Sequence, residues 1–375
     1  IIIKPAKGDN GFSAHTDSGL VTKVTITGCE FQITPCDAKD FKGGMSGQVA
    51  AVYGYQTANF EITGTDFTIA DGPGNGYTTA VMSWNKDVTV TGCNVTGYSK
   101  FLNIDAATSL TVTGNHAYNM LGPIKNASGQ YKNGTFIQLA NTGGATQTGE
   151  IVVTGNEIND SDADFKGIAT YPLAEKNNEG KDNTPTKLTK FTTDMDVVFK
   201  GIVTIEDVSI GGNIELYEEN DIPAKVTIAN NGSLTVAAGK TLTADASSTI
   251  TNNGILFNNG TVKMDEGSTY SGTSGTFVAG AGSTATILVS KDSTLNAKGT
   301  GIVNGSAPAG EDANKADLSD VTGVTVAQVN GYLNAKMDVI LPITDGLTIT
   351  KDDKIIVVPG SSLTGTVKFD EKNSV

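Results

Sequence analysis

The chain has 375 residues, of which 18% are charged and 6% aromatic, and its formal net charge is −14. An acidic surface repels nucleic acid and anionic membranes, which argues against both as partners. All 26 basic residues are Lys; this weakens any proposal of a polyanionic ligand, because Arg is the preferred bidentate partner of carboxylate and phosphate. The 45 Gly residues, with abundant Thr, Asn and Ser, favour short strands and tight turns. No apolar run is long enough for membrane insertion.

The first residues and the three cysteines are considered in turn. The chain opens on Ile1-Ile2-Ile3 with no signal peptide, so we expect a processed or truncated piece of a longer protein. Three cysteines are too few for a disulfide framework. Cys29 and Cys93 are expected to fill a crowded turn, and the spacing leaves a Cys29–Cys36 disulfide undecided.

An eight-residue phrase recurs within residues 1–173. Each copy alternates large apolar residues with Thr, Glu or Val and ends in a Gly-containing turn, which indicates a strand with one buried face. The copies are Val24–Phe31, Phe60–Phe67, Val88–Val95, Leu110–Ala117 and Ile151–Ile158. Their Gly residues, at 28, 64, 92, 114 and 155, are unevenly spaced. We therefore expect a solenoid with one coil per phrase, loops of different length, and positive φ at these Gly residues.

A second strand is predicted upstream of each phrase. Its inward-facing pairs are expected to be Val52/Gly54, Ala80/Met82, Leu102/Ile104, Ile137/Leu139 and Ile168/Thr170. Its outward-facing pairs are then Tyr53/Tyr55, Val81/Ser83, Asn103/Asp105, Gln138/Ala140 and Ala169/Tyr171. Trp84 is expected at the adjoining bend.

After residue 173 the sequence pattern differs from that of the repeated phrases. Residues 174–196 are predicted to be a polar loop or linker, and residues 197–304 a second solenoid run with short turns. Within 305–375, Thr325 is a candidate N-cap for a short amphipathic helix that ends near Leu333, and strands follow it. That segment is either a cap on this solenoid or the start of a further one.

Two of the phrases carry a family resemblance. Leu110–Ala117 and Ile151–Ile158 resemble the repeat of right-handed parallel β-helix proteins, the pectin-lyase-like superfamily, in which turn Asn residues stack. Asn115 and Asn156 match that turn, whereas Cys29, Thr65 and Cys93 depart from it. The resemblance covers residues 16–172 and implies an all-β, right-handed parallel β-helix. Residues 231–243 look more like bacterial surface adhesins.

The activities found in this superfamily make specific demands. Its pectate-lyase-like enzymes use an Arg or Lys base beside Asp residues that hold Ca²⁺, and the absence of Arg excludes the Arg version. Its polygalacturonase-like hydrolases use several Asp residues and a Gly-His-Gly segment, which neither His15 nor His116 matches. If the chain is an enzyme, Asp105 is its most plausible acid, because it is the one carboxylate of the outward-facing pairs.

The outward-facing residues suggest a shallow glycan-binding face. Aromatic rings stack on sugars, and amide and carboxylate groups bond to their hydroxyls. The candidate residues are Tyr53, Tyr55, Trp84, Asn103, Asp105, Gln138 and Tyr171. Scattered surface aromatics that only cover core edges are the plainer interpretation.

One acidic run suggests a metal. Asp160, Asp162 and Asp164 resemble the start of a calcium loop, but Phe165 and Tyr171 stand where an EF-hand needs Gly and Glu. A solvated acidic turn is therefore favoured over Ca²⁺, and no other cofactor is predicted.

The leading hypothesis is a non-enzymatic extracellular or cell-surface β-helix of bacterial origin, a stalk or adhesin-like module that binds a polysaccharide or host glycan. The alternative is a polysaccharide lyase or glycoside hydrolase that acts on the outer face.

Overall fold

The computed structural model describes residues 12–15, 23–34, 48–55, 59–70, 77–84, 87–105, 107–125, 131–132, 134–140, 149–312, 315–342, 347–350 and 352–369. These residues form an all-β parallel β-helix, as the repeated phrase predicts. The chain divides into two compact units. Unit 1 comprises Ile1–Ile202 and Glu219–Ile222, and unit 2 comprises Val203–Glu218 and Pro223–Val375.

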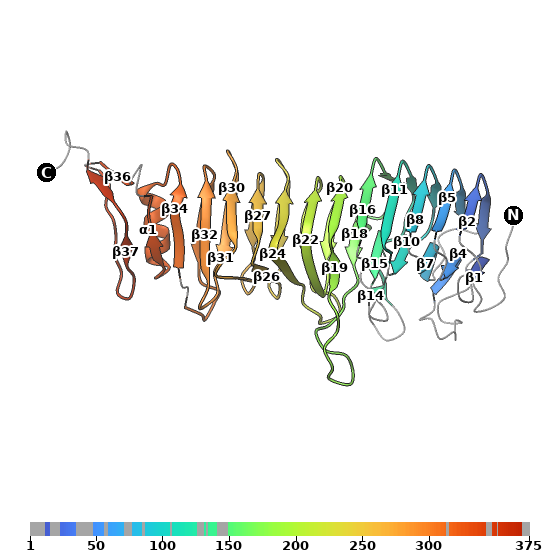
Figure 1. Ribbon diagram of the computed structural model, residues 1–375, viewed down its shortest axis with the longest axis horizontal. Coiled ribbons are helices and arrows are strands. Elements are labelled where there is room, and N and C mark those ends of the chain that lie inside the picture. Colours follow the sequence, from blue (N-terminus) through green and yellow to red (C-terminus); the bar gives the residue numbers. More distant parts are fainter. Residues whose placement is uncertain are drawn as a thin grey trace. The chain divides into compact units, whose positions relative to one another are not determined.

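Unit 1 is built from stacked parallel strands (Figure 1) that form three sheets, and each of its first five coils contributes one strand to each sheet. Sheet 1 consists, in spatial order, of β1 (Phe12–His15), β4 (Gln48–Tyr55), β7 (Tyr77–Trp84), β10 (Lys100–Asp105), β15 (Thr135–Ala140), β18 (Lys166–Thr170) and β21 (Val197–Phe199). Sheet 2 consists of β2 (Lys23–Thr27), β5 (Asn59–Thr63), β8 (Asp87–Thr91), β11 (Ser109–Thr113), β16 (Glu150–Thr154) and β20 (Lys190–Thr193). Sheet 3 consists of β3 (Glu30–Ile33), β6 (Asp66–Ile69), β9 (Asn94–Thr96), β12 (His116–Tyr118) and β17 (Glu157–Asn159).

The core of unit 1 follows the strand phase predicted for the phrase. On sheet 2 the inward residues stack in register, because Ile26 pairs with Ile62 and Ile62 with Val90. The buried members of these columns are Ile26, Phe60, Ile62, Val88, Val90, Leu110, Val112, Ile151 and Val153. The alternate positions are half-buried or exposed and rich in Thr, so the hydroxyl ladder forms the outer surface of this sheet.

A two-residue turn joins sheet 2 to sheet 3 in five coils of unit 1. Its first residue is Gly28, Gly64, Gly92, Gly114 or Gly155, with φ between 53° and 65°. This left-handed conformation favours Gly, as predicted. The second residue of each turn faces inward or lies half-buried: Cys29, Thr65, Cys93, Asn115 and Asn156.

Two asparagines stack at this turn. Asn115 Nδ2 donates to Asn156 Oδ1 at 2.8 Å and to the Val90 carbonyl at 3.0 Å. Asn115 Oδ1 accepts from the Cys93 backbone N–H at 2.9 Å. The ladder thus satisfies two buried backbone groups of one coil and links three successive coils. Cys29 and Cys93 are free thiols, while Cys36 lies outside the described residues.

Between the coils, the chain makes excursions of different length. A polar segment between β18 and β19 (Thr186–Leu188) folds back on itself through an isolated antiparallel bridge between Lys176 and Asp182, and it extends away from the sheets in Figure 1. A short antiparallel pair, β13 (Ile124–Lys125) and β14 (Tyr131–Lys132), precedes β15. These excursions explain the uneven spacing of the phrases.

Unit 2 continues with parallel strands and shorter turns. β22 (Ile202–Ile210) leads into it. One sheet contains β23 (Ile214–Leu216), β25 (Thr241–Ala244), β28 (Thr261–Met264), β31 (Thr284–Leu288) and β33 (Ile302–Ser306). The long strand β24 (Lys225–Val236) pairs at its start with β26 (Thr249–Asn252), which pairs with β29 (Thr269–Ser271). Its end begins a second stack with β27 (Ile255–Asn258), β30 (Thr276–Ala279), β32 (Thr294–Gly299), β34 (Lys315–Val321), β35 (Asp338–Ile340) and β37 (Leu363–Thr364).

The predicted helix is present in unit 2 as α1 (Val326–Asn334). Thr325 caps it through a reciprocal pair of bonds with Gln328, and Val329, Tyr332 and Leu333 are buried. Two further strands, β36 (Leu347–Ile349) and β38 (Val367–Phe369), pair in parallel after the helix.

Candidate functional site

The candidate residues lie in two adjacent rows on the outer face of sheet 1. Backbone pairing aligns Tyr53 with Met82, Met82 with Asn103, and Asn103 with Gln138. The row two positions further along contains Tyr55, Trp84, Asp105, Ala140 and Tyr171, from successive strands. In-register parallel strands lie about 4.8 Å apart, so side chains in one row are neighbours.

The predicted phase of β7 is wrong by one residue. Val81 pairs with Val52 and Leu102 and is fully buried, so Val81 and Ser83 face inward, and Met82 faces outward. The reason is the length of the connection to sheet 2. Residues 85–86 separate β7 from β8, whereas 56–58 separate β4 from β5. The correction moves Trp84 from the expected bend into the outer row beside Tyr55.

A lysine of β10 also lies on this face. The register of β10 with β15 is unbroken, since Lys100 pairs with Thr135 and Leu102 with Ile137. The Phe101 ring lies 6.2 Å from Phe67 and 5.1 Å from Phe136 in the core. With Phe101 and Leu102 both facing inward, Lys100 and Asn103 share the outer face. A strict alternation of side chains puts these two residues on opposite faces, which is why the sequence did not indicate Lys100.

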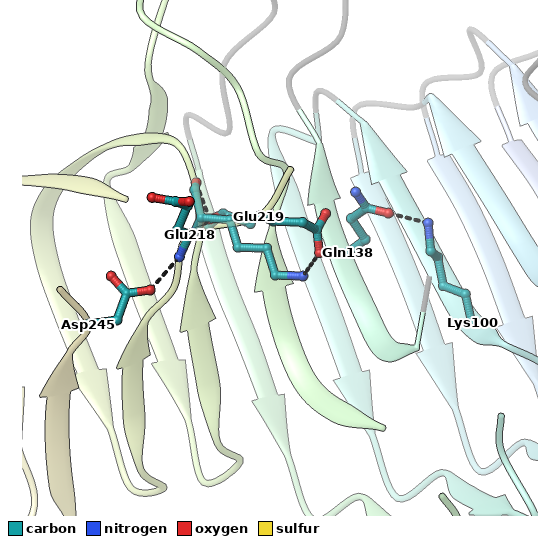
Figure 2. Close-up of polar contacts among 7 residues, drawn as sticks. Lys100, Gln138, Glu218, Glu219 and Asp245 are labelled. Atoms are coloured by element: carbon teal, nitrogen blue, oxygen red, sulfur yellow. Dashed lines mark hydrogen bonds and ion pairs between the residues drawn. The ribbon is translucent and has the colours of Figure 1, made fainter. Parts of the chain in front are cut away.

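Lys100 organises the amides of the first row. Its ammonium donates to Oε1 of Gln138 (Figure 2). It also donates, at 3.5 Å, to Oδ1 of Asn103. Lys100 is only 3% exposed, whereas Asn103 and Gln138 are half-buried. The three side chains therefore form a fixed polar cluster that spans two adjacent strands.

The second row combines aromatic rings with a carboxylate. Asp105 is 7% exposed, and Trp84, Tyr171 and Tyr53 are half-buried. The Tyr55 side chain lies outside the described part of the chain, as does that of Ala140. Half-burial leaves part of each of these residues accessible, and an accessible ring face can stack on a ligand.

A buried ion pair lies at the far end of the second row. Lys200 Nζ contacts Glu219 Oε2 at 2.5 Å, and both side chains are about nine-tenths buried, with 9% and 11% exposed. By the register of β18 with β21, Lys200 lies next to Tyr171 in this row. The backbone N–H of Lys200 donates to Thr170 Oγ1 at 2.7 Å. Burial, and secondarily the charge of Glu219, raise the pKa of Tyr171.

Glu219 reaches this position through a tight turn. Asn220 and Asp221 both have positive φ, 55° and 63°. On either side of them, Glu219 and Ile222 pair in an isolated antiparallel β-bridge. Asn and Asp tolerate this conformation better than other non-Gly residues. In unit 2, the backbone N–H of Glu218 donates to Asp245 at 2.6 Å, which fixes the chain immediately before the turn (Figure 2).

The remaining candidate residues lie elsewhere. Asp160, Asp162 and Asp164 are exposed, and Asp162 Oδ1 accepts from the Asp164 backbone N–H at 2.9 Å. Among the described residues, no group of three or more His, Cys, Asp or Glu side chains is placed to hold a metal ion. His116 lies on sheet 3, 3.1 Å from Glu157, and the side chain of His15 is not described.

Comparison of the chain with protein-family models, curated proteins and solved structures found no match. Within the part of the chain that the structure describes, no helix is long and apolar enough to cross a membrane.

Proposed function

We propose that the protein is a non-catalytic extracellular or cell-surface β-helix, a stalk or adhesin-like module whose sheet 1 outer face binds glycans. The observation that carries the proposal is the alignment of amide and aromatic side chains from successive coils in two adjacent rows. Such a surface offers ring faces for stacking and polar groups for hydroxyls at a regular spacing. A polysaccharide or host glycan is the proposed partner.

The proposal includes a bacterial origin and membership of the pectin-lyase-like superfamily. Its support is the stacked Asn turn at Asn115 and Asn156 together with parallel sheets of one strand per coil. The net charge of −14 supports the exclusion of nucleic acid as a partner.

The first test is binding to a glycan array by the wild type, Trp84→Ala and Tyr118→Ala. Trp84 lies in the second row, whereas Tyr118 is a half-buried aromatic on sheet 3 and serves as the matched control. Loss of one stacking ring should weaken binding by about tenfold, the effect of roughly 1.4 kcal/mol, in Trp84→Ala only.

Two results would reject the proposal: no glycan retained by the wild type, or equal losses in the two variants. Release of sugar from neutral and acidic polysaccharides, abolished in Asp105→Asn, would instead establish the enzymatic alternative on the same face.

A further inference from the structure

The contacts of Lys100 fix the direction of two amide groups. An ammonium group only donates hydrogen bonds, so the side chains that it contacts must turn their oxygens toward it. Gln138 and Asn103 both present oxygen to Lys100 Nζ. Their NH₂ groups therefore point away from the lysine, and Figure 2 shows the Gln138 nitrogen on the side opposite its bonded oxygen.

The outer face consequently presents a pair of donors. Gln138 and Asn103 are directly paired on adjacent strands, whose backbones lie about 4.8 Å apart, so the two amide side chains are neighbours. Among the described residues, neither amide nitrogen has a hydrogen-bond acceptor. A ligand group at this point must therefore supply an acceptor oxygen.

An acceptor of the protein lies next to this pair. Asp105 is the next outward residue of β10 after Asn103, about 7 Å further along the strand. Asp105 has a contact within the protein, but a carboxylate has about four acceptor positions, so such a contact does not by itself exclude a further N–H from a ligand. The face thus offers two donors and then an acceptor along one line.

We propose that this line of groups, the amide subsite formed by Asn103, Gln138 and Asp105, binds the acetamido group of an N-acetylhexosamine. A trans amide directs its C=O and N–H in opposite directions. The carbonyl oxygen accepts from Asn103 and Gln138, and the N–H donates to Asp105. The inference rests on the proposed glycan binding and names the sugar class.

Other sugar groups fit this arrangement less well. A hydroxyl group is too short to meet both the amide pair and Asp105 at once. A sugar carboxylate satisfies the amide pair but lies close to the buried Asp105, where like charges repel. The subsite therefore distinguishes an acetamido sugar from its plain and acidic counterparts.

The test measures binding of paired sugars that differ only at this group. The probes are oligomers of N-acetylglucosamine and of glucose with the same linkage, together with N-acetylgalactosamine and galactose, and an oligogalacturonate. Calorimetry with the wild type should show at least about tenfold tighter binding of the acetamido member of one pair. In the isosteric variants Asn103→Asp and Gln138→Glu, an oxygen replaces the NH₂ group and Lys100 keeps its contact, so this preference should fall by about tenfold.

Gln32→Glu is the matched control, because Gln32 is a half-buried amide on sheet 3. It should retain the preference, and circular dichroism should show all three variants folded. Binding of glucose or galacturonate oligomers as tight as that of acetamido sugars overturns the subsite but leaves glycan binding in place. An array on which no glycan is retained overturns both proposals together.

Discussion

The Asn turn provides the sharpest test of how the coils hold together. Asn115 is fully buried and joins three coils, because it bonds to Cys93, Val90 and Asn156. In Asn115→Ala, the Cys93 backbone N–H loses its acceptor and the Val90 carbonyl loses a donor. An unsatisfied buried polar group costs about 1–3 kcal/mol, so the variant should lose about 2–4 kcal/mol of local stability. That is a large part of the total of about 5–15 kcal/mol expected for a domain.

The assay is native-state hydrogen exchange at the Cys93 amide, because stacked coils open locally rather than as one unit. Exchange there should accelerate by a factor of about thirty or more in Asn115→Ala. Asn94→Ala is the control, since Asn94 is exposed and makes its side-chain bond to the exposed Asp66. Equal exchange at Cys93 in both variants would refute the view that the Asn ladder holds adjacent coils together.

Four further predictions concern the fold. Ile62→Asp should abolish folding, because Ile62 is fully buried, whereas Thr63→Asp should reduce stability only slightly, because Thr63 is half-buried. Equal melting temperatures of the two variants would contradict the assigned strand phase. Gly92→Ala should cost about 1–2 kcal/mol in a denaturant titration through its φ of 62° alone, because nothing lies within 4 Å of the added Cβ. Burial raises the pKa of Tyr270 to about 12, above the unfolded value of about 10. Its contribution to stability is therefore full below pH about 10 and lost as pH rises through 12, and Tyr270→Phe should remove this part of the alkaline decline in melting temperature. Thr325→Ala should cost about 1 kcal/mol and accelerate amide exchange in α1.

The sequence was sufficient to predict the stack because its main signal is local. The alternation in the phrase and the Gly at a fixed position specify strand and turn without long-range information. The same reasoning predicted α1, where a Thr N-cap precedes apolar residues at helical spacing. Asn115 and Asn156 also stack as their repeated position indicated.

The candidate site was predicted less completely, because small shifts of register decide which face a side chain occupies. The shorter connection after β7 turned Met82 outward and Val81 inward. Burial of both Phe101 and Leu102 accompanies the contact of Lys100 with Asn103, which no alternating pattern anticipates. Lys200 and Glu219 meet only because a tight turn returns the chain to unit 1, and their separation in sequence gives no sign of the contact.

The unequal connections of unit 1 have an evolutionary consequence. The turn from sheet 2 to sheet 3 is always two residues long, whereas the connections on either side of sheet 1 vary widely in length. Insertions and deletions at the margins of sheet 1 leave the Gly-Asn corner untouched. Descendants of this chain can therefore diversify what surrounds the outer rows of sheet 1, and with it their ligand preference, while they inherit one unchanged scaffold.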